Sequence, residues 1–185
     1  GIVSENVRPE YGQLYSQLAS EQEKASGPAV IDAHLTAPQA GRQEVILLGS
    51  AGQRVITAGE LLCMAGLTAG LQTTQKNEYN ITVLRGPSIS ELILSPQEID
   101  FTGIETPHVV VALDQEGVDR RRDLFDHLTK ETLIMGIKGV NLPDSKARVH
   151  HIDLKAEGIK RADWALTSLA VLARRKKVIT PQMLE

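Results

Sequence analysis

From Glu44 onward, short apolar runs alternate with segments whose apolar residues recur at helical spacing. The strand-like runs are EVILLG (44–49), PHVVVALD (107–114), TLIMGI (132–137) and RVHHIDL (148–154). The helical patterns cover residues 55–69, 117–128 and 159–177, and Gly70 is a suitable end for the first of them. Strands that alternate with helices form largely parallel sheets covered by helices on both faces. The sequence therefore predicts an α/β fold, a three-layer α/β/α sandwich with a mostly parallel sheet.

One stretch interrupts this alternation. NEYNITVLRGPSISELILSPQEI (77–99) contains two strand-like runs on either side of Arg85-Gly86-Pro87. A Gly-Pro pair favours a turn. We therefore expect an antiparallel hairpin inserted in the sheet.

The first 43 residues differ in texture from the rest, and we expect them to form a helix and a linker or arm ahead of a main domain at 44–185. A short helix is predicted to begin near Pro9, because one helical face collects Tyr11, Leu14, Tyr15 and Leu18. Residues 25–43 are rich in Ala, Pro and Gly, which favours a linker or an arm. Two alternatives stay open: the extension packs on its own domain, or it docks on a partner subunit.

Composition excludes several classes of partner and site. The formal net charge is -3 and aromatic residues are 3%, so neither a broad basic field nor a base-stacking platform is expected, and nucleic-acid partners are not predicted. No apolar run approaches the roughly 20 residues that cross a bilayer, so no membrane partner is predicted either. The single cysteine, Cys63, excludes an intrachain disulfide and a cysteine-based iron–sulfur or zinc site within one chain. These features predict a cytoplasmic protein.

Several reactive or charged residues favour structural roles. Cys63 lies in an apolar helical pattern, which is typical of a small buried side chain. His150 and His151 are neighbours on a predicted strand, so they point to opposite faces, and no metal site is predicted. Residues 120–122 (RRR) read as a solvated helix face, with anion contact as the alternative. Residues 174–177 (RRKK) read as a cationic helix end, with a docking patch as the alternative.

The glycine-rich turn after the first strand is the strongest candidate binding site. In ILLGSAGQRVITAGELL (46–62), a strand runs directly into a helix, whose unpaired first amides favour an anion. The turn combines small and polar residues: Gly49, Ser50, Gly52, Gln53 and Arg54. The spacing matches neither G-x-G-x-x-G nor a P-loop. Both a phosphate or nucleotide site and a tight corner without a ligand remain open on these residues alone.

Other candidate binding residues lie near predicted strand ends. Arg85 stands at the expected hairpin turn, with Ser88 close by, and could hold a phosphate or carboxylate. Asp114 and Gln115 follow a strand end, where parallel sheets place their ligands. If the strand order reverses there, these residues and the glycine turn share one crevice.

Three segments resemble one protein family, the gamma subunit or gamma domain of 2-oxoacid:ferredoxin oxidoreductases. GSAGQRVITAGELLCMAGLTAG (49–70) is similar to the family's opening G-x-G-G-Q-G turn and its helix ending in Ala-Gly. LRGPSISELILSPQEI (84–99) resembles its R-G-G-x-S-x-S segment, and ETPHVVVALDQEGVDR (105–120) resembles its next strand. The resemblance covers about residues 44–177, with several departures. Ala51, Arg54 and Pro87 stand where glycines are usual, and His108 stands where an aspartate is common. EYNITVL (78–84) stands where the family usually has Tyr-Gly-Pro-Glu.

The resemblance implies a subunit of an enzyme rather than an enzyme active alone. Relatives work with alpha and beta subunits that bind thiamine diphosphate and magnesium, and with a ferredoxin-like subunit that carries iron–sulfur clusters. Together they oxidatively decarboxylate a 2-oxoacid such as pyruvate or 2-oxoglutarate, load coenzyme A with the acyl group and reduce ferredoxin. The chain is expected to be the non-redox gamma component, without a catalytic residue or a cofactor of its own, closing the active site or lining the coenzyme A approach.

The residues expected to contribute to binding in such a complex come from the glycine turn, the hairpin and the second strand end: Gly49, Ser50, Gly52, Gln53, Arg54, Arg85, Ser88, Asp114 and Gln115. Two alternatives to the gamma-component hypothesis are a stand-alone nucleotide or coenzyme A binding module and a scaffold that has lost its ligand. A homodimer is an alternative assembly.

Overall fold

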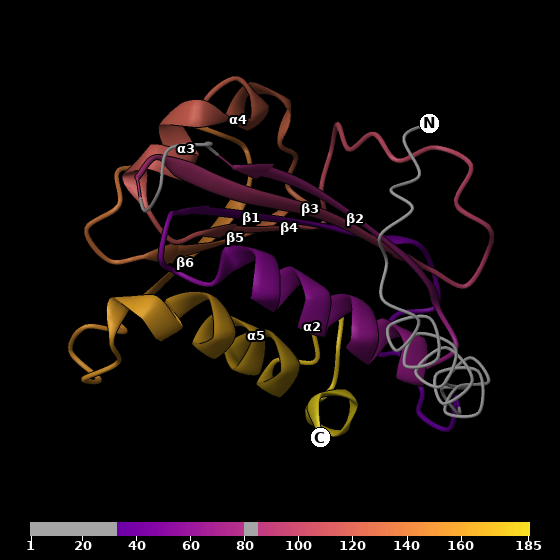
Figure 1. Ribbon diagram of the computed structural model, residues 1–185. Coiled ribbons are helices and arrows are strands. Elements are labelled where there is room, and N and C mark those ends of the chain that lie inside the picture. Colours follow the sequence, from indigo (N-terminus) through magenta and orange to yellow (C-terminus); the bar gives the residue numbers. More distant parts are fainter. Residues whose placement is uncertain (1–32, 80–84) are drawn as a thin grey trace, which may run out of the picture. The chain divides into compact units, whose positions relative to one another are not determined.

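A six-stranded sheet organises residues 33–79 and 85–185, the residues that the computed structural model describes. The strands are β1 (Gln43–Ser50), β2 (Gln72–Tyr79), β3 (Pro87–Ser95), β4 (Val109–Ala112), β5 (Leu133–Ile137) and β6 (Arg148–Ile152). Their order across the sheet is β2-β3-β1-β4-β5-β6 (Figure 1). The predicted helix near Pro9 and the first part of the predicted linker lie outside the described residues.

The sheet is mixed in the way the sequence predicts. β1, β4, β5 and β6 are mutually parallel, whereas β3 runs antiparallel to both of its neighbours, β2 and β1. β2 and β3 therefore form an antiparallel hairpin in the sheet, as predicted, but β2 (Gln72–Tyr79) begins five residues before the predicted segment 77–99. β3 begins at Pro87, directly after the turn residue Gly86. Residues 80–84, between the two strands, lie outside the described part of the chain.

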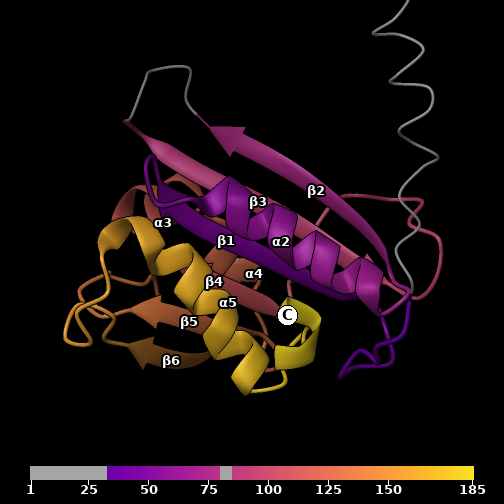
Figure 2. The same ribbon diagram turned by 60° about the horizontal axis from the view of Figure 1, so that its bottom comes forward.

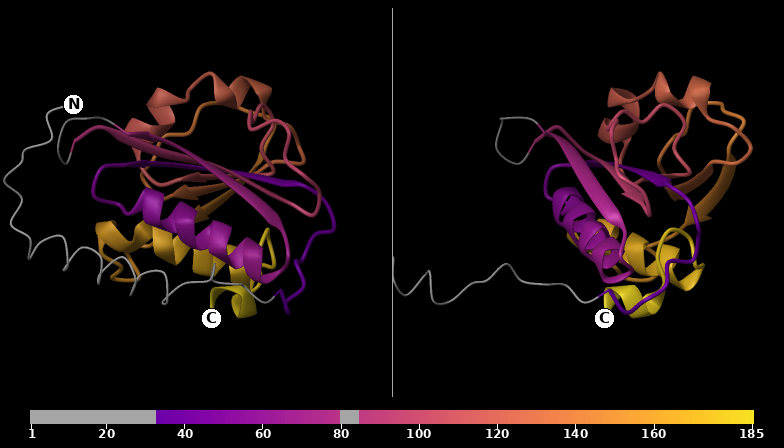
Figure 3. Two further views of the ribbon diagram at one scale, coloured as in Figure 1. Left: turned by 45° about the vertical axis from the view of Figure 1, so that its right-hand side comes forward. Right: turned by 90° about the vertical axis from the view of Figure 1, so that its right-hand side faces the viewer.

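Helices cover both faces of this sheet. α2 (Val55–Thr68) and α5 (Trp164–Arg174) lie side by side on one face, and α3 (Gln115–Arg120) and α4 (Leu124–His127) cover the other (Figures 1 and 2). Two short 3₁₀ turns, η1 (Arg161–Asp163) and η2 (Pro181–Leu184), flank α5. The layers are separated clearly in Figure 3, so the predicted three-layer sandwich is confirmed. Among the described residues, no helix is both long and apolar enough to cross a bilayer.

Two apolar cores result, one on each face of the sheet. Leu47 in β1 packs toward α2 and α5, whereas its neighbours Ile46 and Leu48 pack toward α3 and α4. Because β1 and β4 are buried on both faces, they are continuous apolar runs rather than alternating ones. Each fully buried aliphatic side chain of this kind contributes about 1.5–3 kcal/mol.

Two helix predictions need correction. The pattern at 117–128 is not one helix: α3 ends at Arg120 and α4 begins at Leu124. The chain turns between them, where the Arg121 guanidinium reaches Glu91 of β3 at 2.6 Å. The pattern at 159–177 also overestimates the last helix, since α5 covers only Trp164–Arg174 after the 3₁₀ turn. By contrast α2 ends next to Gly70, whose φ of 70° suits the predicted helix stop.

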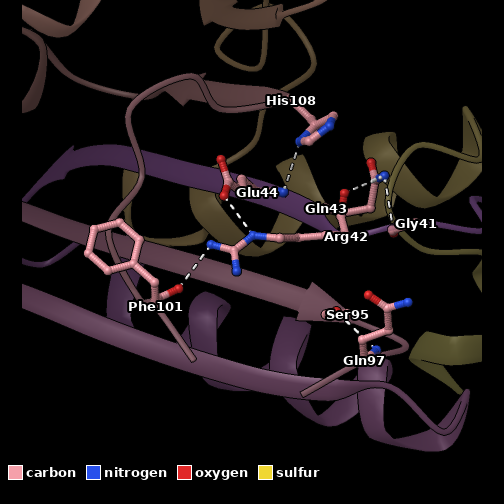
Figure 4. A network of polar contacts seen from close by, with 8 residues as sticks. All are labelled: Gly41, Arg42, Gln43, Glu44, Ser95, Gln97, Phe101 and His108. Carbon is pink, nitrogen blue, oxygen red and sulfur yellow. Dashed lines mark hydrogen bonds and ion pairs between the residues drawn. The ribbon is translucent and has the colours of Figure 1, made fainter. Parts of the chain in front are cut away.

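The long connection from β3 to β4 is fastened to the start of β1. Arg42 donates through Nε to Glu44 Oε1 (2.8 Å) and through Nη2 to the Phe101 carbonyl (3.1 Å) (Figure 4). The Glu44 amide in turn donates to His108 Nδ1 (3.2 Å). These contacts hold the connection at the amino ends of the parallel strands. The glycine turn lies at the other end of β1.

Candidate functional site

The carboxyl ends of β1 and β4 lie next to each other, and the strand order reverses between them. After β1 the chain passes through α2 to β2 and β3 on one side, and after β4 it passes through α3 and α4 to β5 and β6 on the other. Such a switch point opens a crevice above the strand ends, where α/β proteins bind ligands. The strand order therefore reverses at this point, as the prediction of a shared crevice requires, and the crevice itself stays a prediction.

The glycine turn between β1 and α2 has an unusual backbone. Gly52 has a φ of 84° and open space around the position of a side chain, so the backbone is accessible there. Arg54, the N-cap of α2, has a φ of 55° and offers no side-chain cap to the helix. This left-handed conformation favours glycine, so an arginine at position 54 is conformationally unfavourable. The first turn of α2 is thus uncapped by side chains.

Two residues of the turn build it rather than face a ligand. Gln53 is fully buried: its Oε1 accepts from the Ser50 amide at 2.8 Å, and its Nε2 donates to Asp114 Oδ2 at 3.4 Å. A Cβ on Gly49 would lie 2.5 Å from Val55 Cγ2 and 2.8 Å from Gln53 Oε1. Packing therefore requires glycine at 49, and the internal hydrogen bonds account for Gln53.

An arginine that the sequence analysis did not single out joins this cluster. Arg161, in η1, donates through Nη2 to Ser50 Oγ (2.9 Å) and to Asp114 Oδ2 (2.6 Å). Its neighbour Asp163 forms an ion pair with Arg54 at 3.0 Å. Two ion pairs therefore fasten the turn before α5 to the ends of β1 and β4. The side chains of Arg54 and Arg161 are still 56% and 53% exposed.

The remaining predicted residues lie at different distances from this centre. The Ala51 amide donates to the Gly86 carbonyl at 2.9 Å, which brings the exposed Arg85 backbone close to the glycine turn. Ser88 is buried and pairs with Gly49 across the β3–β1 ladder. Gln115 is engaged by Asn141, whose amide donates to Gln115 Oε1 at 2.9 Å. The structure thus gathers Ser50, Gly52, Arg54 and Asp114 most closely.

These groups suit an anion. Two half-exposed guanidinium groups and the uncapped start of a 14-residue helix point positive charge at one accessible corner. Among the described residues, no group of three or more His, Cys, Asp and Glu side chains could hold a metal ion. The corner therefore combines two guanidinium groups and a helix start, which can bind a negatively charged group such as a phosphate, with the carboxylates of Asp114 and Asp163.

Comparison with known proteins identifies the family. Residues 44–178, well over half of the chain, match the family described as pyruvate ferredoxin/flavodoxin oxidoreductase. The chain belongs to this family. The match covers the whole sheet and both helical layers, and the family resemblance seen in the sequence is confirmed.

Curated members of the oxidoreductase family include clear relatives of this chain. The 2-oxoglutarate synthase subunit KorC of Methanocaldococcus jannaschii is 27% identical over 150 residues, which are 78% of this chain and 80% of the relative. The subunit of the same name from Methanothermobacter marburgensis is 33% identical over 78 residues, 42% of each chain. These relatives are named as subunits of an oxidoreductase, and the prediction that the chain is a gamma-type enzyme component is confirmed with the family.

Solved structures show the same fold. The gamma subunit of a keto/oxoacid ferredoxin oxidoreductase from Geobacter sulfurreducens matches with a TM-score of 0.61 and 22% identity, over 78% of this chain and 82% of that chain. A 2-oxoglutarate:ferredoxin oxidoreductase from Magnetococcus marinus, solved with 2-oxoglutarate, coenzyme A and succinyl-CoA, matches with a TM-score of 0.67 and 17% identity. That match covers 79% of this chain and 26% of the longer one. The oxidoreductase-family fold therefore forms one part of a larger polypeptide in that protein.

Proposed function

We propose that this chain works in a complex that oxidatively decarboxylates a 2-oxoacid and transfers the acyl group to coenzyme A. Its partners in this proposal are alpha and beta subunits that bind thiamine diphosphate and magnesium, and a ferredoxin-like subunit that carries iron–sulfur clusters. The match to the family over residues 44–178 carries the proposal. The names of the curated relatives favour 2-oxoglutarate as the 2-oxoacid to test first, with pyruvate second. A reducing, cytoplasmic location is part of the proposal and agrees with the single cysteine.

In this proposal the glycine turn contributes an anion cradle to the coenzyme A path. Coenzyme A carries phosphate groups, and the corner offers Gly52, Arg54 and Arg161 together with the start of α2. Arg54 and Arg161 are held by the carboxylates of Asp163 and Asp114. The Arg54–Asp163 pair, with side chains 56% and 40% exposed, contributes only about 0–1 kcal/mol, so a phosphate can replace the Asp163 carboxylate at small cost. Asp114 is only 16% exposed, so it stays paired with Arg161, whose remaining N–H groups are available to a phosphate.

The other predicted residues have graded roles in this proposal. Arg85, exposed beside the turn, is placed to reach a ligand or a neighbouring subunit. Ser50 and Asp114 position the Arg161 guanidinium. Gly49, Gln53 and Ser88 shape the turn from within, and Gln115 supports the neighbouring connection through Asn141.

The component role is tested by reconstitution. Partner subunits from the same source are purified with and without this chain, and reduction of ferredoxin or a viologen dye is followed with each 2-oxoacid and coenzyme A. We expect activity that depends on coenzyme A and on the chain, and that is lost when the chain is omitted. Unchanged activity without the chain would exclude the role.

A further inference from the structure

A second charged region lies at the far end of α5 from the glycine turn. Residues 174–177, which we call the basic turn, are Arg174, Arg175, Lys176 and Lys177, and all four are exposed. In the described part of the chain, no carboxylate forms an ion pair with any of them. Arg175 instead contacts the His150 ring, 2.6 Å from its Nε2. The basic turn is thus a concentration of uncompensated positive charge on a chain whose formal net charge is -3.

The helix dipole explains only part of this charge. α5 ends at Arg174, and cations stabilise a helix within its last turn. Lys176 and Lys177 lie beyond that turn, where the dipole effect has fallen away. The dipole therefore does not by itself account for these two charges.

The backbone of the basic turn is built and fixed. Lys176 and Val178 have φ values of 50° and 66°, left-handed conformations that non-glycine residues adopt only when the surroundings impose them. Lys176 adopts this conformation where α5 ends: its amide donates to the Ala173 carbonyl at 2.9 Å, and the Lys177 amide donates to the Leu172 carbonyl at 3.0 Å. Gln39 holds the turn that follows, because its Nε2 donates to the Lys176 carbonyl and its Oε1 accepts from the Val178 amide, each at 2.9 Å. Val178 and Ile179 are buried in the core beneath. The two lysines are consequently presented from a rigid base, so little backbone order is lost if a partner engages them.

The position of the basic turn separates it from the anion cradle. Lys177 lines a small hollow of about 200 Å³ with Gln43, Val109, Leu133 and Arg148, which lie at the amino ends of four neighbouring strands. The glycine turn is at the carboxyl end of β1, and α5 runs alongside α2 away from it (Figure 1). One carboxylate, that of Glu131, lines the same hollow. Arg148 adds a further cation there, so positive charge is in excess at this edge.

We propose that the basic turn is a docking surface for an acidic patch on a partner subunit of the same oxidoreductase. This inference rests on the proposed function, because it assigns the partner to that complex. Charge complementarity supports an acidic protein surface, and such surfaces accelerate and orient association. The low aromatic content and negative net charge of the chain disfavour nucleic acid as the occupant.

The test measures association of the full chain with its purified partner subunits by surface plasmon resonance. Lys176→Glu/Lys177→Glu is compared with Arg122→Glu/Lys155→Glu, an equal charge change at exposed positions without ion pairs to described carboxylates. Lys176→Gln/Lys177→Gln serves as a milder variant, and unfolding curves establish that each variant is folded. We expect the reversal at the basic turn to slow association about tenfold or more at about 50 mM salt, and the difference to vanish at about 500 mM. The control pair should stay within about twofold of wild type.

Each outcome decides between the two proposals. If wild type does not bind the partner subunits at low salt, the proposed function fails. If wild type binds and the basic-turn variants bind at the same rate, only the docking proposal fails. A short DNA duplex is tested in parallel, and loss of DNA binding in the variants with unchanged subunit association would also overturn the docking proposal.

Discussion

At the scale of single residues, Gly117 controls how closely α3 approaches the glycine turn. A Cβ there would lie 2.5 Å from the Gly49 amide nitrogen and 2.6 Å from the Leu48 carbonyl carbon, which are backbone atoms. We expect Gly117→Ala to lower the free energy of unfolding by about 2–3 kcal/mol, because a backbone contact cannot be relieved by a rotamer change. Gly41→Ala is the matched control, since nothing lies within 4 Å of its Cβ. Urea unfolding measures both, and equal midpoints would contradict the packing described here.

His150 provides a second residue-level prediction, one that depends on pH. Burial, and next the positive charge of Arg175 and of His151, lower the pKa of His150 below its ordinary value. The native state then binds fewer protons than the unfolded state, so the contribution of His150 to stability falls as the pH drops through about 6.5. In an NMR titration we expect Arg175→Gln to raise the His150 midpoint and Arg122→Gln to leave it unchanged. An identical midpoint in all three proteins would show that Arg175 does not act on this ring.

At the scale of elements, an ion cluster joins the inserted hairpin to α3. Glu91 of β3, only 8% exposed, accepts from Arg121 at 2.6 Å and pairs with Lys76 of β2 at 3.6 Å. Glu78 of β2 pairs with Arg120 and Arg121 in turn. The cluster therefore spans the sheet edge and the helix above it.

Removal of the central carboxylate charge should loosen this connection. We expect Glu91→Gln to cost about 1–2 kcal/mol, because it leaves the partly buried Arg121 charge without its closest partner. Glu157→Gln, at an exposed position without an ion pair to described residues, should change the free energy of unfolding by less than about 0.5 kcal/mol. Thermal or urea unfolding distinguishes the two, and a neutral Glu91→Gln would mean that the cluster contributes nothing to the fold.

The same cluster shows where sequence reasoning stops at this scale. Apolar periodicity predicted the buried strands and α2 correctly, because buried positions are occupied mainly by apolar residues. Residues 120–122 were expected to be a solvated face of one helix. Arg120 and Arg122 are exposed, as expected, whereas Arg121 is partly buried because β3 brings Glu91 opposite it. Arg120 pairs with Glu78 of β2. That register depends on strand pairing, which periodicity does not encode.

At the scale of the whole molecule, the sequence was enough to predict the fold class and the family. It predicted only some of the residues that meet at the candidate site. The glycine turn and Asp114 could be placed together, since both follow strands at the carboxyl edge of a parallel sheet. Arg161 could not, because it follows the last strand, β6, which is separated from β1 by β4 and β5. Only the return of the chain toward α5 brings it to Ser50 and Asp114. The sequence signal that could have pointed to Arg161 is a cationic residue just before the final helix.

The most direct test of the proposed cradle measures the KM for coenzyme A in the reconstituted complex. The complex carries Arg161→Gln, and Arg161→Lys serves as the conservative variant and Arg122→Gln as the control. Because Arg161→Gln removes a charge-assisted hydrogen bond, we expect it to raise the KM for coenzyme A about tenfold or more. Arg161→Lys should restore this KM in part. The kcat and the KM for the 2-oxoacid should stay within about twofold of wild type. A KM for coenzyme A that is the same in Arg161→Gln, the control and wild type would contradict the assignment of the glycine turn as an anion cradle.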